Sequence, residues 1–187
     1  MLINKHLITN LMNGDAYAQK AFYKHYFGYV MAICVRYLPR EEALEACQDV
    51  FLKVFKNIDK FQVDRDLKKW MSSITINECI DRIRKNKKNL NETYLEEEVE
   101  SNITYMNVEI TENLDTEYIL KLIDKINIDH KTVFLLYVVD GYSHKEISEK
   151  LNININTSRW HLAEARKAII PLIQQHYLNE SETGKYY

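Results

Sequence analysis

One stretch constrains the fold of this chain more than any other: residues 142–170 predict two helices joined by a tight turn. Ser143 suits the N-cap of the first helix, and Glu146 three residues later completes a capping box. The Asn-Ile-Asn segment at 152–154 interrupts the helical pattern, because Asn is a poor helix former that tolerates turn conformations. A turn this short keeps the helices from lying antiparallel over their length. The stretch therefore predicts a helix-turn-helix.

The second helix of this pair is predicted to begin at Asn156 or Thr157 and to end near Ile170, with apolar positions at intervals of three and four. Polar, aromatic and basic residues crowd its first turn and outer face: Thr157, Ser158, Arg159, Trp160, His161, Arg166 and Lys167. Arg can donate to guanine or phosphate, hydroxyls can reach backbone oxygens, and a helix N-terminus favours phosphate. The pattern favours a DNA-reading helix. The alternative is an ordinary helical hairpin whose polar face is only solvated.

The composition favours helices over strands and tight turns. The 187 residues include only 4 Gly and 2 Pro, and 46% are hydrophobic and 28% charged, which is typical of a soluble globular chain. The length suits one large domain or two small ones. We therefore expect an all-α fold.

Membrane, metal and redox sites are not predicted. Asn and Lys interrupt the apolar residues at the start of the chain, so it carries no signal-peptide pattern. The longest apolar run, Val133–Val139, is far too short to span a bilayer. Cys34, Cys47 and Cys79 are scattered without a CxxC pair, so we expect buried thiols in a reducing cytoplasm. No cofactor is implied.

Charge is strongly segregated along the chain, although the net charge is only −2. Residues 1–91 hold sixteen Lys/Arg and ten Asp/Glu, whereas residues 92–117 hold nine acids and no base. The remainder is nearly neutral, with nine bases and eight acids. This pattern predicts two helical domains, 1–90 and 116–187, joined by an acidic flexible linker over 91–115.

The first domain is predicted to be a helical bundle. Apolar residues recur at helical spacing in four segments, 5–12, 15–38, 41–58 and 66–85, and a loop at 59–65 precedes the last. The stripe of the third segment comprises Leu44, Cys47, Val50, Phe51, Val54 and Phe55. In the fourth segment, Trp70 is expected to pack inward because it lies four residues before Ile74.

The fourth segment ends in an unusually basic run, with five bases among the seven residues Arg82–Lys88. Basic residues at a helix C-terminus are ordinary complements of the helix dipole. Five at this density exceed what capping needs, so a track for nucleic-acid phosphates is equally plausible.

The second domain is predicted to begin with a helix whose apolar stripe runs over 119–126. Asp129 is expected to cap the next helix, His130–Val139, and Gly141 to end it in a left-handed conformation. The helix-turn-helix then completes a four-helix unit, and the polar tail after Tyr177 is expected to fray.

Short motifs occur in order along both domains. The first domain contains Gln48-Asp49-Val50-Phe51, followed by Trp70-Met71, Ile74, Asn77 and Asp81-Arg82. The second contains Asp140-Gly141-Tyr142-Ser143, Glu146-Ile147, Leu151 and Ala165-Arg166. With the bundle, the acidic segment and the helix-turn-helix, these motifs resemble a sigma-70 family factor of the two-domain extracytoplasmic-function (ECF) type. The resemblance covers roughly residues 15–88 and 118–170.

The resemblance implies roles in the first domain. The helix over 41–58 would dock on the β′ clamp helices of core RNA polymerase through Glu45, Gln48, Asp49 and Phe51, although Phe51 could equally be core. The loop and next helix would read the −10 promoter element with Phe61, Asn77, Arg82, Arg84, Lys85, Lys87 and Lys88. Where the family has Ala-Glu-Asp, this chain has Ala43-Leu44-Glu45.

In the second domain, the resemblance implies that Thr157, Ser158, Arg159, His161 and Arg166 read the −35 element. Trp160 and His161 depart from the family's usual recognition helix. The second domain would also contact the polymerase β flap, with the acidic linker in the RNA exit channel. The family further implies promoter DNA as a partner and control by an anti-sigma factor, often membrane-anchored.

The resulting interpretation is a cytoplasmic promoter-specificity subunit that is neither an enzyme nor a membrane protein. The first alternative is a stand-alone helix-turn-helix regulator that binds duplex DNA without polymerase. A helical enzyme is a weaker alternative, because the chain has no HExxH pair, no Gly-rich phosphate loop and no nucleophile elbow.

Overall fold

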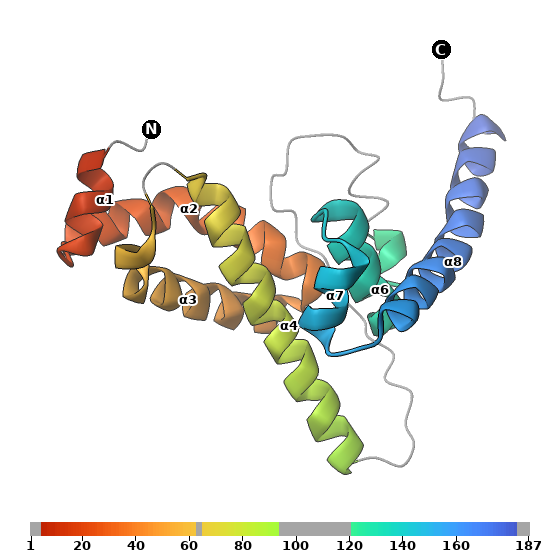
Figure 1. Ribbon diagram of the computed structural model, residues 1–187. Helices are drawn as coiled ribbons and strands as arrows, with labels where there is room; N and C mark the ends of the chain where they lie inside the picture. The colour runs from red at the N-terminus through yellow and green to blue at the C-terminus, as the bar shows by residue number, and fades with distance from the viewer. Residues whose placement is uncertain (1–4, 63–64, 94–120, 183–187) are drawn as a thin grey trace. The chain divides into compact units, whose positions relative to one another are not determined.

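The computed structural model describes residues 5–62, 65–93 and 121–182, and every regular element within these ranges is helical (Figure 1). Contacts divide the chain into two compact units. None of the helices in the described ranges combines the length and apolar character that a membrane crossing requires.

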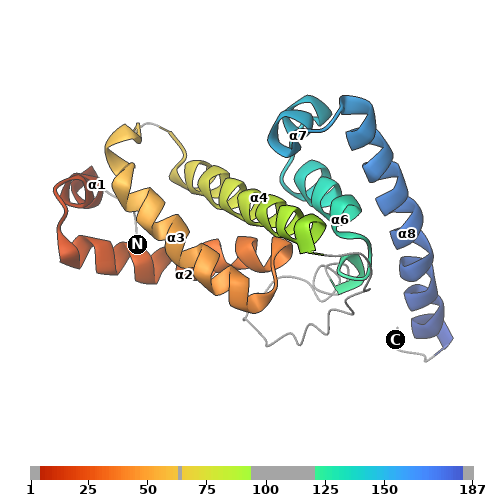
Figure 2. The same cartoon turned by 90° about the horizontal axis from the view of Figure 1, so that it is seen from below.

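The first unit contains α1 (Lys5–Met12), α2 (Ala16–Tyr37), α3 (Arg40–Lys56), the short 3-10 helix η1 (Ile58–Lys60) and α4 (Leu67–Thr93). The helices α2, α3 and α4 pack against one another, and α4 crosses the other two (Figures 1 and 2). These elements confirm the predicted bundle.

Local side chains set the ends of these helices. The Asp15 carboxylate caps α2 by accepting a 2.7 Å hydrogen bond from the Ala18 amide. Leu38 is extended because the residue before a proline avoids the helical region, and Pro39 then starts α3. The Asp66 carboxylate accepts from the Lys68 and Lys69 amides at 2.9 and 3.2 Å, which starts α4.

The core of the first unit follows most of the predicted apolar stripes, but α3 departs from its stripe. All three cysteines lie in it, each fully buried, as expected. Leu44 was predicted to belong to the stripe of α3, but 38% of its surface is exposed. The prediction is wrong because the buried face of α3 is rotated toward Ala43 and Ala46, away from Leu44, and it leaves Phe55 only half-buried. The fully buried residues of α3 are Ala43, Ala46, Cys47, Val50, Phe51 and Val54.

The helix α4 continues to Thr93, beyond the predicted end at Lys85. The basic run Arg82–Lys88 therefore lies within the helix rather than at its terminus, and residues 91–93 of the predicted linker are helical. The rest of that linker lies outside the described residues.

The second unit contains α6 (Ile128–Phe134), the π-helix η2 (Leu135–Val139), α7 (His144–Leu151) and α8 (Ile155–Glu182). Of the predicted first helix, residues 121–126 are described; 121–123 are helical, and a turn over 124–126 ends the helix earlier than predicted. Ile123, Ala165 and Ile169 form one buried cluster, against which Ile126 and Phe134 pack. The apolar face predicted for the second helix of the helix-turn-helix is thus confirmed.

The helix-turn-helix forms as predicted, and specific side-chain and backbone features mark its helix ends. Ser143 and Glu146 make a complete capping box at the start of α7. Gly141 is left-handed, with φ +75°, and Asn152 takes the left-handed conformation in the turn, with φ 53° and ψ 48°. Both observations agree with the turn chemistry expected from the sequence.

Three helix ends differ from the predictions. Asn127, not Asp129, caps α6: its side chain accepts a 2.9 Å bond from the Asp129 amide. Asn154, not Asn156 or Thr157, caps α8 by accepting a 2.8 Å bond from the Asn156 amide. In both cases the side-chain oxygen of an Asn accepts from the backbone N–H two residues later in the chain. Helix α8 continues beyond Ile170 to Glu182 with Pro171 inside it.

Candidate nucleic-acid interface

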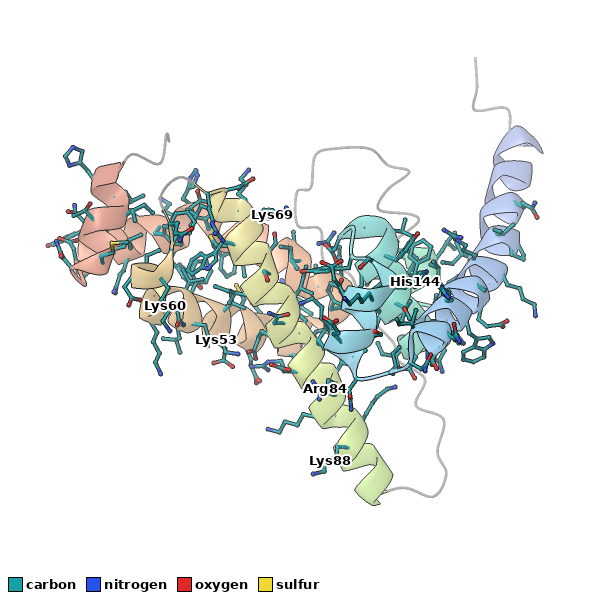
Figure 3. All side chains as sticks on the ribbon, in the orientation of Figure 1. Lys53, Lys60, Lys69, Arg84, Lys88 and His144 are labelled. Atoms are coloured by element: carbon teal, nitrogen blue, oxygen red, sulfur yellow. The ribbon has the colours of Figure 1, made fainter. Side chains whose placement is uncertain are left out.

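The exposed bases of α4 form the first candidate surface. Arg84, Lys85 and Lys88 are exposed on the C-terminal half of the helix, as Figure 3 shows for Arg84 and Lys88. Arg84 makes a long contact of 3.9 Å with Asp81, and Lys87 is half-buried. Asn77 is exposed about two turns before Arg84 in the same helix. This part of α4 can therefore present positive charge and one amide to a phosphate backbone or a base.

Arg82 does not belong to this exposed set. Only 19% of its side chain is exposed, and its three guanidinium nitrogens all donate to carboxylates. Nε bonds Glu78 at 2.8 Å, one terminal nitrogen bonds Glu45 at 3.2 Å, and the other bonds Asp49. Burial alone would lower the pKa of Arg82, but these hydrogen bonds outweigh it and raise the pKa. The residue predicted to track phosphates is instead held between α3 and α4.

The structure thus brings together residues that were predicted to act at different surfaces. Glu45 and Asp49, expected to contact polymerase, share one ion-pair network with Arg82, expected to contact DNA. A further hydrogen bond joins α4 to α3, in which the Asn86 side-chain amide donates to Glu42 at 2.9 Å. Gln48, also predicted for polymerase, is exposed on α3.

Glu78 lies at the centre of this network, and sequence reasoning did not identify it. Its side chain is only 9% exposed, and its two oxygens accept from Lys53 and Arg82. Burial raises the pKa of the Glu78 carboxyl, but the two cations more than compensate and the pKa lies below its usual range. The available signal was the spacing of Glu78 and Arg82, which are four residues apart on one helix.

Two aromatic residues assigned to interfaces are buried instead. Phe51 is 2% exposed and contacts the Tyr23 ring at 4.6 Å, so it packs in the core, which was the alternative weighed above. Phe61 is 6% exposed and packs against Trp70, with ring centroids 5.2 Å apart. Neither ring offers free apolar surface here. The neighbouring Leu52, which is 67% exposed, does.

The outer face of α8 forms the second candidate surface. Arg159 and Trp160 are exposed near its start, with Trp160 at 54%, and Arg166 is exposed about two turns after Arg159. Arg159 donates a 3.2 Å bond to the Asn156 side chain, which holds the guanidinium over the first turn. Thr157 is half-buried beside it. These side chains can reach a groove from the N-terminal end of the helix.

Two residues predicted to read DNA face inward. Ser158 is fully buried, and its hydroxyl shares a 2.9 Å hydrogen bond with Nδ1 of His144 on α7 (His144 is labelled in Figure 3). His161 is half-buried, and its Nδ1 lies 2.9 Å from Nδ1 of His130 on α6. This placement follows from helix geometry, because successive helical residues turn by about 100° and only part of a crowded first turn can face outward.

His144 is held in a setting that disfavours its charged form. Its ring stacks on Tyr137 at 4.6 Å, and burial is the main cause that lowers the pKa of His144. The positive charges of Arg159 and Arg166 lower that pKa further. The contact between α7 and α8 therefore uses a neutral imidazole near neutral pH.

Family comparisons match both units. The family model described as Sigma-70 region 2 matches residues 22–89, and that described as Sigma-70, region 4 matches residues 116–169. The first covers α2 to α4 apart from a few residues at its ends, and the second includes the helix-turn-helix.

Relatives that match most of the chain are also sigma factors. The ECF RNA polymerase sigma factor SigW of Bacillus subtilis is 30% identical, over 90% of this chain and 95% of that protein. The ECF RNA polymerase sigma-E factors of Haemophilus influenzae and Escherichia coli K12 are each 22% identical over 92% of this chain, covering 96% and 95% of those proteins.

A solved structure shares the fold. The sigma factor RpoE of Bartonella quintana, in complex with the anti-sigma factor NepR, aligns with a TM-score of 0.53 and 19% identity, covering 83% of this chain and 96% of that one. With region 2 and region 4 matched in order and a 30% identical relative that spans both, this chain belongs to the ECF group of the sigma-70 family of RNA polymerase sigma factors.

Proposed function

We propose that the two units divide promoter recognition between them: α4 contacts the −10 element, α8 contacts the −35 element, and α3 binds core RNA polymerase. One observation carries this proposal. The regions matched to sigma-70 region 2 and region 4 each contain a helix with exposed basic side chains, Arg84, Lys85 and Lys88 on α4 and Arg159 and Arg166 on α8.

The first unit contacts the −10 region as the strands separate. A base taken out of the stack costs a few kcal/mol, which stacking and edge hydrogen bonds in a protein site can repay. Asn77 supplies an exposed amide for such a base, while Arg84, Lys85 and Lys88 follow the phosphates, with Lys87 at the edge of this set. Phe61 and Arg82 are left out of the direct contacts, because one is buried and the other is fully engaged with carboxylates.

The second unit reads duplex DNA in the −35 region. Arg159 and Arg166 are exposed where a recognition helix meets base edges and phosphates, and Thr157 lies beside them. Trp160 adds an exposed apolar surface, which suits contact with a thymine methyl group. Ser158 and His161 support this helix from within rather than touching DNA.

Partner binding is proposed for the exposed face of α3 and for the second unit. Glu45, Gln48 and Asp49 offer acceptors and an amide to a basic surface of the β′ clamp, and Leu52 offers apolar area in place of Phe51. The second unit would contact the β flap. An anti-sigma factor is a further proposed partner, in keeping with the complex of the Bartonella relative. In this role the chain itself catalyses no reaction, because the chemistry of initiation belongs to the polymerase.

The direct test is transcription in vitro with core polymerase and a template library randomised at the −35 and −10 positions. The expected result is a new set of start sites that share one sequence at each element. A pull-down with core polymerase provides the discriminating control. No association with polymerase, combined with binding of duplex DNA by the chain alone, would favour a stand-alone regulator instead.

A further inference from the structure

The structure contains a charged residue that neither the recognised motifs nor the proposed interfaces use. Glu78 lies on the face of α4 that meets α3, is 7% exposed as a residue, and is one of few charged residues among the buried set of the described ranges. A buried carboxylate is costly unless it is paired and hydrogen-bonded. The partners of the Glu78 carboxylate therefore indicate its role.

Both oxygens of Glu78 are occupied by cations from two helices. Oε2 accepts from Nζ of Lys53 on α3, and Oε1 accepts a 2.8 Å bond from Nε of Arg82 on α4. The pairing with these cations keeps the pKa of Glu78 low, so the carboxylate is charged at neutral pH. Glu78 is thus a two-sided anchor between α3 and α4.

The anchor fixes the direction of the Arg82 side chain. A guanidinium is planar and its donors have a fixed geometry, so a bond at Nε determines where the two terminal nitrogens point. Here those nitrogens reach Glu45 and Asp49 on α3. Without Glu78, Arg82 would keep its two more exposed partners, whose side chains are 74% and 48% exposed, and lose the buried one.

We propose that Glu78 is a positioning residue: through Lys53 and Arg82 it fixes α4 against α3, and so sets where the exposed Asn77 and the basic residues beyond Arg82 stand relative to the exposed face of α3. The effect on DNA rests on the proposed function, since α4 is taken as the −10 contact and α3 as the polymerase contact. The effect of Glu78 on the placement of α4 against α3 is independent of the proposed function.

The primary variant is Glu78→Gln, which keeps the shape and removes the charge. Its amide group would have to face Lys53 or Arg82, both of which are donors, so one of the two anchors is lost. The matched control is Asp81→Asn, the same charge change three residues along α4 on a carboxylate that is 64% exposed.

Helix placement is measured without polymerase or DNA. Spin labels at Gln48→Cys on α3 and Lys85→Cys on α4 both occupy exposed positions, while the three native cysteines are buried. The distance distribution between the labels, measured by pulsed electron paramagnetic resonance, should broaden or shift with Glu78→Gln and stay unchanged with Asp81→Asn. An unchanged distribution with Glu78→Gln overturns the proposal.

The functional consequence is measured at saturating core polymerase. Glu78→Gln should reduce the rate of −10 opening by about tenfold or more, because small misplacements of contacting groups cost large factors in rate, with polymerase affinity within about threefold of wild type. Asp81→Asn should stay within about twofold in both measurements. Opening at the wild-type rate, or equal losses in opening and affinity, overturns the positioning role.

A second variant covers the case in which Glu78→Gln does not fold. Arg82→Lys keeps the positive charge but replaces three directed donors with one ammonium group, so it cannot bridge Glu78, Glu45 and Asp49 together. It should reproduce the altered label distances and the slower opening, and normal behaviour would overturn the proposal. If wild type initiates at no promoter, the proposed function fails, while the label distances still decide whether Glu78 places α4.

Discussion

At the scale of single residues, neighbouring side chains on one helix have opposite environments. Phe51 is 2% exposed and packs among aromatic rings, whereas Leu52 is 67% exposed. Ser158 is fully buried while Arg159 is exposed. A shift of one position turns a side chain by about 100° around the helix axis. Motif matching identifies the right segment, but it does not say which residue of the segment faces a partner.

The Phe51 and Leu52 pair provides a matched test of this point. Phe51→Ala should lower the free energy of unfolding by about 3–5 kcal/mol, because it removes a buried ring. Leu52→Ala should change stability by less than about 0.5 kcal/mol and yet weaken binding to core polymerase. Urea unfolding and a polymerase binding assay measure the two effects. A stable Phe51→Ala protein with impaired polymerase binding would restore Phe51 to the interface.

Asn77 is the exposed amide proposed to hold a −10 base. Asn77→Ala should slow promoter opening by about tenfold, equivalent to about 1.4 kcal/mol, and leave polymerase affinity unchanged. Asn13→Ala is the control, because Asn13 is an exposed amide in the turn before α2. Opening by Asn77→Ala at the wild-type rate would remove Asn77 from the site.

Arg159 is the exposed base nearest the start of the recognition helix. Arg159→Ala should cost roughly 1–3 kcal/mol in −35 binding and relax sequence preference at one position. Lys125→Ala, an exposed base in the turn before α6, serves as the control. Footprinting of the polymerase complex on promoter variants provides the measurement. An unchanged footprint and unchanged preference would count against groove contact by Arg159.

At the scale of elements, the sequence predicted most helices and turns because their determinants are local. The Ser143 capping box, the left-handed Gly141 and the Asn152 turn each depend on residues within a few positions of one another. The ion-pair network does not: Arg82 meets Glu45 and Asp49 across 37 and 33 positions of sequence. That contact depends on how α4 packs on α3, which no local pattern determines.

The left-handed turn between α7 and α8 has a conformational requirement of its own. Asn152→Ala should lower the free energy of unfolding by about 1 kcal/mol, because a φ of +53° is less favourable for Ala than for Asn, whose short polar side chain can hydrogen-bond locally. Asn152→Gly should be nearly neutral or slightly stabilising, since Gly adopts this conformation freely. Trp160 fluorescence during urea unfolding, in a Trp70→Phe background, reports on this unit. Greater loss with Gly than with Ala would contradict the assigned turn.

The junction of α3 and α4 should respond to acid. The folded pKa of Glu78 is below its ordinary value of 4.5, so its stabilising contribution is present above that value and is lost as pH falls through the folded pKa. Trp70 fluorescence in a Trp160→Phe background should show acid destabilisation of the first unit below about pH 4.5. Glu78→Gln should flatten that dependence. An identical pH profile in both proteins would show that Glu78 makes no such contribution.

At the scale of the whole molecule, the chain joins two helical units that each match one region of the sigma-70 family. The fold class and the order of the units follow from periodicity and turn chemistry, whereas the division of surfaces between DNA and polymerase needed the packed structure. Arg82, Ser158 and Phe51, which were predicted to contact partners, bond or pack within their own unit. The exposed residues that remain as proposed DNA contacts are fewer than those predicted from the sequence, and most of them are basic.

The most direct test of this account is permanganate footprinting on a promoter selected from the randomised library. With the chain and core polymerase together, thymines in the −10 region should become reactive as the strands separate, and neither component alone should produce this reactivity. Reactivity absent from the combined sample, or equal with core polymerase alone, would contradict the central claim that this chain directs polymerase to a promoter and helps to open it.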